Sequence, residues 1–381
     1  MKPTRMLLLS LLYGLIVIAN GAQAQFSTSA TVTSMYDDNV NNNYLHLSDK
    51  VTEASLGLGY DWETESSNTQ LFYTGSLNYF STITARTFHA HSFGVTYSKL
   101  FDEEKQSLLN IGGTFGFRLN RGDYTFYDNT QFSVYGNFKH YLAERVVGRA
   151  SYSFRSVRLS ELPDFNYTEH YGFIQGTFFL PTRTTLILEA DLGTKIYSTP
   201  NYDSTQQSGT HGQGQRRVVT ASTPSVTQLI GLARIGQPIM DGTGLSLTTT
   251  YQVNLQKESR YLSSEFGTIS DDELFDDHYG YEGLQTSLML TQLLPAEMQM
   301  KITGSLQNRK YSDRPAYDLS GTQIAGTRED TRKVLTVQLE KRFQSRGVSL
   351  GLSYDYIIND SNDQFYNYAN NALTVRLSFT Y

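Results

Sequence analysis

The chain has 381 residues, a formal net charge of −6 and no cysteine. The acidic balance disfavours a nucleic-acid-binding protein, which should show a basic excess or a basic stripe. The missing cysteine excludes a disulfide scaffold and any zinc or iron–sulfur site built on cysteine.

The N-terminus has the pattern of a secretory signal peptide. Lys2 and Arg5 precede an apolar run over residues 6–19, and Ala22-Gln23-Ala24 is a small-x-small cleavage site. The run is too short and wrongly flanked for a membrane-spanning helix. We therefore predict a cleaved signal over residues 1–24 and a single mature domain over residues 25–381, with a net charge of about −8.

Alternating polarity fills most of the mature chain. In residues 245–255 and 348–356, for example, apolar side chains take one parity and small or polar side chains the other. Successive strand side chains point to opposite faces, so this period indicates strands with one apolar face. The pattern predicts about sixteen strands. They fall near residues 26–36, 51–62, 69–80, 87–101, 106–120, 127–140, 146–158, 168–180, 184–197, 224–236, 243–256, 278–293, 298–310, 329–343, 347–358 and 370–381.

The connections alternate between short and long. The longest are expected near residues 198–223, 257–277 and 311–328. Short turns on one side and longer loops on the other are typical of outer-membrane barrels, in which the short turns are periplasmic. We predict an all-β, transmembrane, antiparallel up-and-down β-barrel in the outer membrane of a Gram-negative-type bacterium, with both termini periplasmic. The alternatives are a soluble β-sandwich, whose strands are shorter, and a solenoid, for which no fixed repeat is present.

The last segment, residues 371–381, completes this pattern. Leu373, Val375, Leu377, Phe379 and Tyr381 share one parity, and no turn follows them. The strand must therefore pair with other strands, and it is expected to close the sheet against residues 26–36. The terminal aromatic residue resembles the C-terminal signature of bacterial outer-membrane barrels, which implies that this apolar face contacts lipid.

The opposite parity predicts the inner wall of the barrel. Its charged members are Asp61, Arg118, Lys139, Arg149, Arg155, Glu189, Asp191, Lys195, Lys301, Glu340, Arg342, Asp355 and Arg376. Barrels of about 16 strands are too wide for side chains to fill and enclose an aqueous channel unless they are plugged. The wall has more basic than acidic members, which favours anionic solutes. The alternative is a set of ion pairs that only brace the wall.

Candidate chemistry outside the wall is weak. The acidic run 271–278 offers oxygen ligands for Ca²⁺, but it lacks the spacing and glycine of an EF-hand. His89 and His91 share one face of a strand without an evident third metal ligand, and Ser92 points to the other face. The glycine pattern 209–214 is not followed by a helix. We predict no enzyme activity, cofactor or metal site.

The connection near residues 198–223 is rich in Ser, Thr, Gln and Gly. It forms either a flexible cap or an inward-folded constriction. In general diffusion porins a long third outer loop forms the constriction. The third outer loop here, near residues 121–126, is short, so this chain departs from that pattern.

Tyr36-Asp37-Asp38-Asn39-Val40, followed by Leu47-Ser48-Asp49-Lys50 and a Gly-rich strand, resembles the opening of a family of porin-like outer-membrane barrels often found beside exopolysaccharide export systems. The resemblance implies a channel accessory to export of a polar polymer such as exopolysaccharide. It also implies outer-membrane lipid, lipopolysaccharide, polysaccharide and periplasmic export components as partners. The alternatives are a small-solute uptake porin and a surface-interaction barrel with a blocked lumen.

Overall fold

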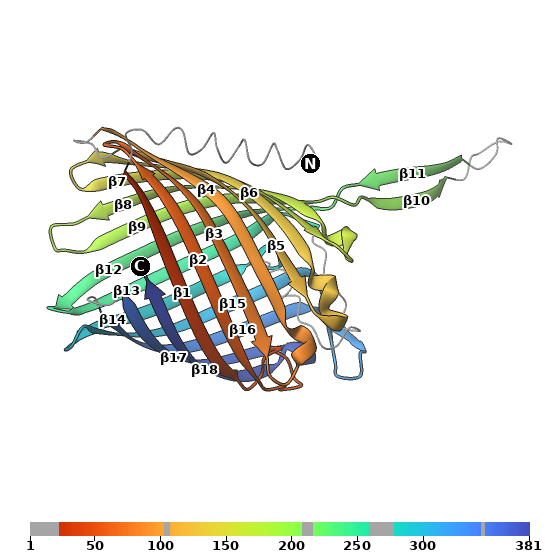
Figure 1. Ribbon diagram of the computed structural model, residues 1–381. Coiled ribbons are helices and arrows are strands. Elements are labelled where there is room, and N and C mark those ends of the chain that lie inside the picture. Colours follow the sequence, from red (N-terminus) through yellow and green to blue (C-terminus); the bar gives the residue numbers. More distant parts are fainter. Residues whose placement is uncertain (1–22, 103–106, 208–215, 259–277, 344–346) are drawn as a thin grey trace, which may run out of the picture.

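The computed structural model describes residues 23–102, 107–207, 216–258, 278–343 and 347–381. In this part of the chain, sixteen strands form one closed barrel in the order β1-β18-β17-β16-β15-β14-β13-β12-β9-β8-β7-β6-β5-β4-β3-β2 (Figure 1). All neighbouring strands of the barrel are antiparallel. The predicted antiparallel up-and-down barrel is therefore confirmed.

The barrel strands are long, as the alternating pattern predicts. Their bounds are β1 Gln23–Asp37, β2 Asp49–Glu63, β3 Ser67–Phe80, β4 Phe88–Asp102, β5 Ser107–Asn120, β6 Asn129–Ala143, β7 Val146–Leu159, β8 Tyr167–Phe179, β9 Thr185–Tyr197, β12 Ser225–Met240, β13 Thr243–Lys257, β14 Gly283–Leu294, β15 Met298–Tyr317, β16 Gln323–Phe343, β17 Val348–Ser361 and β18 Tyr368–Thr380. Each exceeds the 9 to 11 residues that cross a bilayer at a tilt.

The first and last strands close the barrel. Thr33 of β1 pairs with Arg376 of β18, and Val32 pairs with Leu377. Beyond these pairs, the backbones of Thr28 and Tyr381 exchange two hydrogen bonds of 2.8 Å. The predicted closure of the C-terminal strand against the first strand is thus confirmed.

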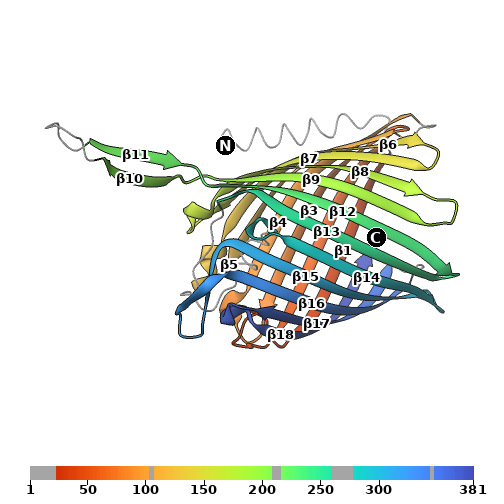
Figure 2. The ribbon, with the colours of Figure 1, turned by 180° about the vertical axis from the view of Figure 1, so that it is seen from behind.

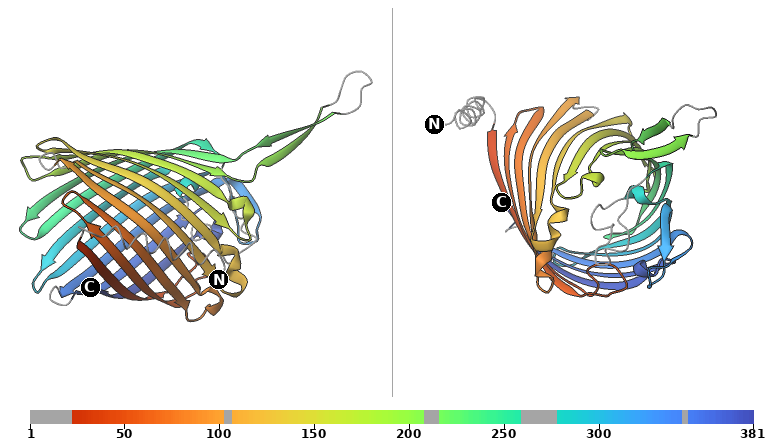
Figure 3. Two further views of the ribbon diagram at one scale, coloured as in Figure 1. Left: turned by 45° about the horizontal axis from the view of Figure 1, so that its top comes forward. Right: turned by 90° about the vertical axis from the view of Figure 1, so that its right-hand side faces the viewer.

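The two ends of the barrel differ. At one end, here called the turn end, β1 begins, β18 ends and the short turns lie. The other end, here called the loop end, carries the 3₁₀ helices η1 (Thr84–Arg86), η2 (Gly122–Tyr127), η3 (Pro163–Phe165), η5 (His278–Gly280) and η7 (Gln364–Tyr366) (Figure 3). Among the described residues, no helix is long and apolar enough to cross a membrane.

Two of the predicted long loops differ from the prediction. Residues 198–223 contain a hairpin of β10 (Asn201–Gln207) and β11 (Arg216–Ser222), which projects away from the barrel mouth (Figures 1 and 2). The predicted loop 311–328 is wrong, because β15 and β16 continue through most of it. Asp318 makes the tight turn between them by accepting hydrogen bonds from the amides of Ser320 and Thr322, and Gly321 supplies a φ of +80°.

Large apolar side chains cover the outside of the barrel. Phe93, Leu188 and Leu352 are exposed examples from three different strands. An outer face of this kind is suited to lipid, since a barrel satisfies all its backbone hydrogen bonds between strands and needs no water there.

Candidate functional site

The inner face of the barrel is polar and continuous across strands. One row of paired residues joins Glu340, Gly351, Arg376 and Thr33 on four successive strands. All the charged residues predicted for the wall lie on this face, opposite to the exposed apolar side chains. The structure divides them into two groups with different surroundings. One group lies toward the loop end and the other toward the turn end.

The charged wall residues toward the loop end contact oppositely charged, hydroxyl or aromatic side chains on neighbouring strands. Arg155 forms an ion pair of 2.6 Å with Glu169, and Tyr171 donates a hydrogen bond of 2.8 Å to Asp191. The ammonium group of buried Lys195 lies 4.3 Å from the ring centroid of Tyr167. These groups therefore brace the wall, as the ion-pair alternative proposed.

Arg118 has a similar setting on β5, two strands from Arg155. Its guanidinium lies 3.6 Å from the ring centroid of Phe88 and 5.3 Å from that of Tyr127, and it also donates to the side-chain oxygen of Asn120. Stacking of this kind holds a guanidinium flat against the wall.

Cations toward the turn end are more open. Lys139, Arg149, Lys301 and Arg376 form no ion pair with any described residue. Lys139 and Arg149 are direct cross-strand partners on one face. Like charges placed opposite each other destabilise a sheet, so this pair has no evident structural benefit.

The acidic wall residues at this level each have an ion-pair or hydrogen-bond partner. Glu340 forms an ion pair of 2.6 Å with Arg342, and Glu189 accepts a hydrogen bond from Gln175. Asp355 accepts a hydrogen bond of 2.6 Å from Thr336. Hydrogen bonds from neutral groups leave Asp61, Glu189 and Asp355 negatively charged. The predicted wall residues in the turn-end half are therefore five basic ones (Lys139, Arg149, Lys301, Arg342 and Arg376) and four acidic ones (Asp61, Glu189, Glu340 and Asp355), an excess of one positive charge.

The charged wall residues missed from the sequence include two in segments without clean alternation. Arg234 lies on the inner face of β12 and donates a hydrogen bond of 3.0 Å to Thr248. Glu169 is the buried partner of Arg155. Apolar side chains fill both parities around each of them, so alternation does not assign their faces. The only sequence signal that could have placed Arg234 and Glu169 on the inner face is their charge, within a segment that is otherwise mostly apolar.

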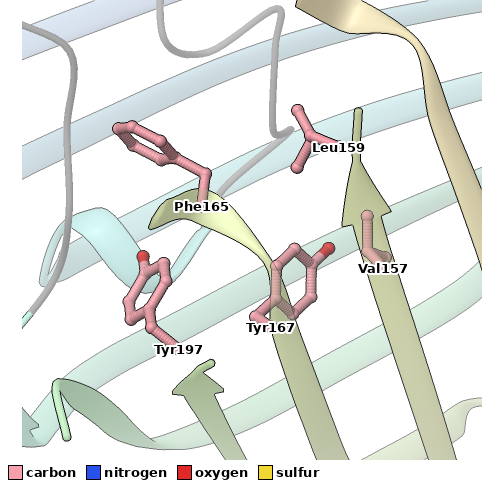
Figure 4. Close-up of a cluster of buried hydrophobic side chains, with 5 residues drawn as sticks. All are labelled: Val157, Leu159, Phe165, Tyr167 and Tyr197. Atoms are coloured by element: carbon pink, nitrogen blue, oxygen red, sulfur yellow. The ribbon is translucent and has the colours of Figure 1, made fainter. Parts of the chain in front are cut away.

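The buried apolar side chains gather near the loop end. One cluster contains Val157, Leu159, Phe165, Tyr167 and Tyr197 and brings η3 against β7, β8 and β9 (Figure 4). A second cluster, of Val40, Val51 and Phe80, joins the β1–β2 loop to β2 and β3. Loop segments thus pack against the inner wall and narrow the mouth.

Residues 278–282, here called the latch segment, lie inside the barrel at this mouth (Figure 3). The side-chain amide of Gln228 donates to the carbonyls of His278 and Tyr281 at 2.9 and 3.2 Å. Gln252 donates to the same two carbonyls at 3.1 and 2.8 Å. The latch segment therefore docks on an amide ladder built by β12 and β13.

Two further contacts hold the same segment. Asn254 donates a hydrogen bond of 2.9 Å to the Tyr279 carbonyl. The Tyr279 hydroxyl donates one of 2.8 Å to Glu169, which lies 110 residues earlier in the chain. Tyr279 is only 2% exposed, so its ring is part of the packed mouth.

A buried guanidinium braces the overhang of β15 and β16. Arg328 forms an ion pair of 2.5 Å with Asp330, and its guanidinium lies 3.4 Å from the ring centroid of Tyr366. Burial raises the pKa of the nearby Asp363 carboxyl, while the Phe365 amide and the Arg328 guanidinium draw it down. The charged form of Asp363 is therefore disfavoured overall.

We expect Arg328→Ala to lower the free energy of unfolding by about 3–5 kcal/mol, because Asp330 would stay buried without its partner. Urea unfolding in detergent micelles measures this. Asp363→Asn is the matched control: it removes a carboxylate whose charge burial disfavours, so no loss of stability near neutral pH is expected. Equal loss in both variants would contradict this role of the ion pair.

The two histidines singled out in the sequence take no part in the inner wall. His89 and His91 face outward, where His91 accepts or donates a hydrogen bond of 2.8 Å with Tyr73 and one of 3.0 Å with His89. The described residues contain no group of three or more potential metal ligands. The acidic residues 271–277 and the glycine pattern 209–214 lie outside the described residues.

Two comparisons bear on this architecture. The chain is similar to Pseudomonas aeruginosa OccK8 (OprE), with a TM-score of 0.50 and 10% identity over 94% of this chain and 98% of that one. It is similar to Pseudomonas aeruginosa OpdQ, with a TM-score of 0.50 and 8% identity over 94% and 97%. The chain has the fold of an outer-membrane β-barrel.

Sequence comparison adds a partial match. Residues 240–381, from the end of β12 to the C-terminus, match the family model described as surface lipoprotein assembly modifier. No curated protein matches the chain.

Proposed function

We propose that the chain is an outer-membrane channel for small polar solutes with a preference for anions. The observation that carries this proposal is the set of cations on the turn-end half of the wall, Lys139, Arg149, Lys301 and Arg376, which have no ion-pair partner among the described residues. Charged side chains in a barrel lumen tune its selectivity. The cleaved signal, the periplasmic turn end and the external loop end are parts of the same proposal.

The packed mouth favours small solutes over a polymer. The latch segment and the two apolar clusters occupy space inside the loop end. A polysaccharide strand would have to pass these docked groups. Export of exopolysaccharide with periplasmic components stays a prediction from the family resemblance.

Planar-bilayer recording tests the proposal. The purified protein is expected to form channels, and the reversal potential in a KCl gradient is expected to show preference for chloride. A barrel that never conducts would refute the channel, while clear preference for potassium would refute the anion preference.

A second candidate function is a part in the assembly of surface lipoproteins. The match of residues 240–381 to the surface lipoprotein assembly modifier family supports it. Deleting the gene and counting lipoproteins at the cell surface separates the two candidates. A loss of surface lipoproteins from cells with unchanged solute uptake would favour the second one.

A further inference from the structure

The lipid-facing wall of β3–β7 is hollowed by a groove, called here the β3–β7 groove. It has a volume of about 900 Å³ and is lined by apolar side chains that include Phe93, Val95, Ile111, Phe115 and Val134. Gly113 lies at its centre between Val95 and Val134. The missing side chain at this position makes the depression.

Polar groups stand at the end of the groove nearest the loop end. His91 lies two residues before Phe93 on β4, and its ring centroid is 5.0 Å from that of Phe117. It is hydrogen-bonded to Tyr73 and to His89, both on the same outward face. Two imidazoles and a phenol therefore interrupt the apolar outer wall at this level.

A guanidinium lies in the same row. The strand register connects His91 to Phe117, Phe117 to Thr130, and Thr130 to Arg158. Three strand spacings place Arg158 about 14 Å from His91 along the wall. Arg158 is exposed and forms no hydrogen bond or ion pair with the described residues.

A smaller groove repeats this arrangement beside the first. It has a volume of about 530 Å³, lies over β7–β9 and is lined by Tyr152, Gly172, Ile174 and Ala190. The Tyr152 hydroxyl is 2.7 Å from the ring nitrogen Nδ1 of His170, which also lines the groove. A tyrosine–histidine pair therefore marks both grooves.

From these observations we infer that this face binds one diphosphorylated glycolipid of the outer leaflet. Its acyl chains occupy the apolar grooves. One phosphate accepts a hydrogen bond from His89, whose Nδ1 is bonded to His91 and whose Nε2 points to no described partner, and the other phosphate accepts from Arg158. Guanidinium and imidazole N–H groups are strong donors to phosphate oxygens, and the groove excludes water from the acyl chains. The inference rests on the outer-membrane location in the proposed function, but not on conduction.

Native mass spectrometry of delipidated protein with added diphosphoryl lipid A tests the site. Gly113→Leu adds a side chain at the centre of the groove, and its Cβ would lie in ordinary van der Waals contact, 3.4 Å from its nearest atoms. Gly304→Leu is the matched control: Gly304 also faces outward, on β15, and an added Cβ meets nothing within 4 Å. The two variants add the same side chain to the same kind of surface.

One bound lipid A is expected on the natural protein and on Gly304→Leu, and none on Gly113→Leu. His89→Ala with Arg158→Ala is expected to weaken binding about fivefold to tenfold, and monophosphoryl lipid A is expected to bind more weakly than the diphosphoryl form. Equal binding by Gly113→Leu and Gly304→Leu, or no binding by the natural protein, would overturn the site.

Conductance of the same samples keeps the two proposals apart. A protein that binds lipid A but never conducts loses its channel function and keeps this site. If Gly113→Leu binds no lipid A but conducts normally, the proposed channel function is unaffected.

Discussion

Replacing Gln228, Gln252 and Asn254 together by alanine is expected to raise the single-channel conductance several-fold. These side chains donate the hydrogen bonds that hold the latch segment against the inner wall. Each such bond contributes about 1 kcal/mol net. Without the set, the carbonyls of the latch segment need water, and the segment is expected to leave the wall and widen the mouth.

Gln338→Ala is the control for the amide ladder. Gln338 faces the same lumen from β16, where it pairs with Lys301 and Ser353 and has no contact with the latch segment. Its loss should leave the conductance unchanged. If the triple variant conducts like the natural protein while its barrel stays folded, the latch segment does not restrict the pathway.

Tyr279→Phe separates the two kinds of latch contact. It removes the hydroxyl that donates the hydrogen bond to Glu169 and keeps the ring in the packed mouth. We therefore expect a smaller rise than in the triple variant, together with more frequent transitions between open and partly closed levels.

Reversing Lys139 and Arg149 to glutamate is expected to change the sign of the reversal potential in a KCl gradient. The two cations are direct cross-strand neighbours on the inner face, so the substitution exchanges two adjacent positive charges for two negative ones. Charge at the wall of a narrow aqueous path acts strongly on passing ions, because less water screens it there than at an open surface. The glutamine pair should give an intermediate value.

A control for net charge is available on the outside of the barrel. Lys99 and Lys341 lie near the turn end on the outward face of β4 and β16. Reversing both makes the same change in total charge without touching the lumen, and the reversal potential should stay as in the natural protein. A sign change in this control would mean that surface charge near the mouth, and not the wall, sets selectivity.

Alternation carried most of the fold prediction because it is a local property. Each strand shows its apolar face to the same surroundings along its length, so the period appears in the residues themselves. The prediction failed where the strands extend beyond the lipid-facing part of the barrel. Residues 311–328 leave the level of the apolar band, so β15 and β16 continue there with another pattern, around Arg328 and Tyr311.

The candidate site was predicted less completely. Parity assigned Lys139, Arg149, Lys301 and Arg376 to the inner face. It did not show that the charged wall residues toward the loop end have ion-pair, hydrogen-bond or aromatic partners. Arg155 has an ion-pair partner because Glu169 faces it on the next strand, and Tyr279 in turn donates to Glu169. Such partners depend on register and on loop docking, which the residues of one strand do not encode.

The sequence by itself determined the barrel. The strand number, the polar inner face and the closing strand all follow from the two-residue period of the side chains. Secretion of the chain stays a prediction. Only the tertiary structure decided what stands in the mouth and on the outer wall. The latch segment meets Glu169 across 110 residues, and the β3–β7 groove needs Gly113 between side chains of two other strands. The physical reason is that alternation reports one residue's surroundings, whereas a contact depends on two distant segments that only closure brings together.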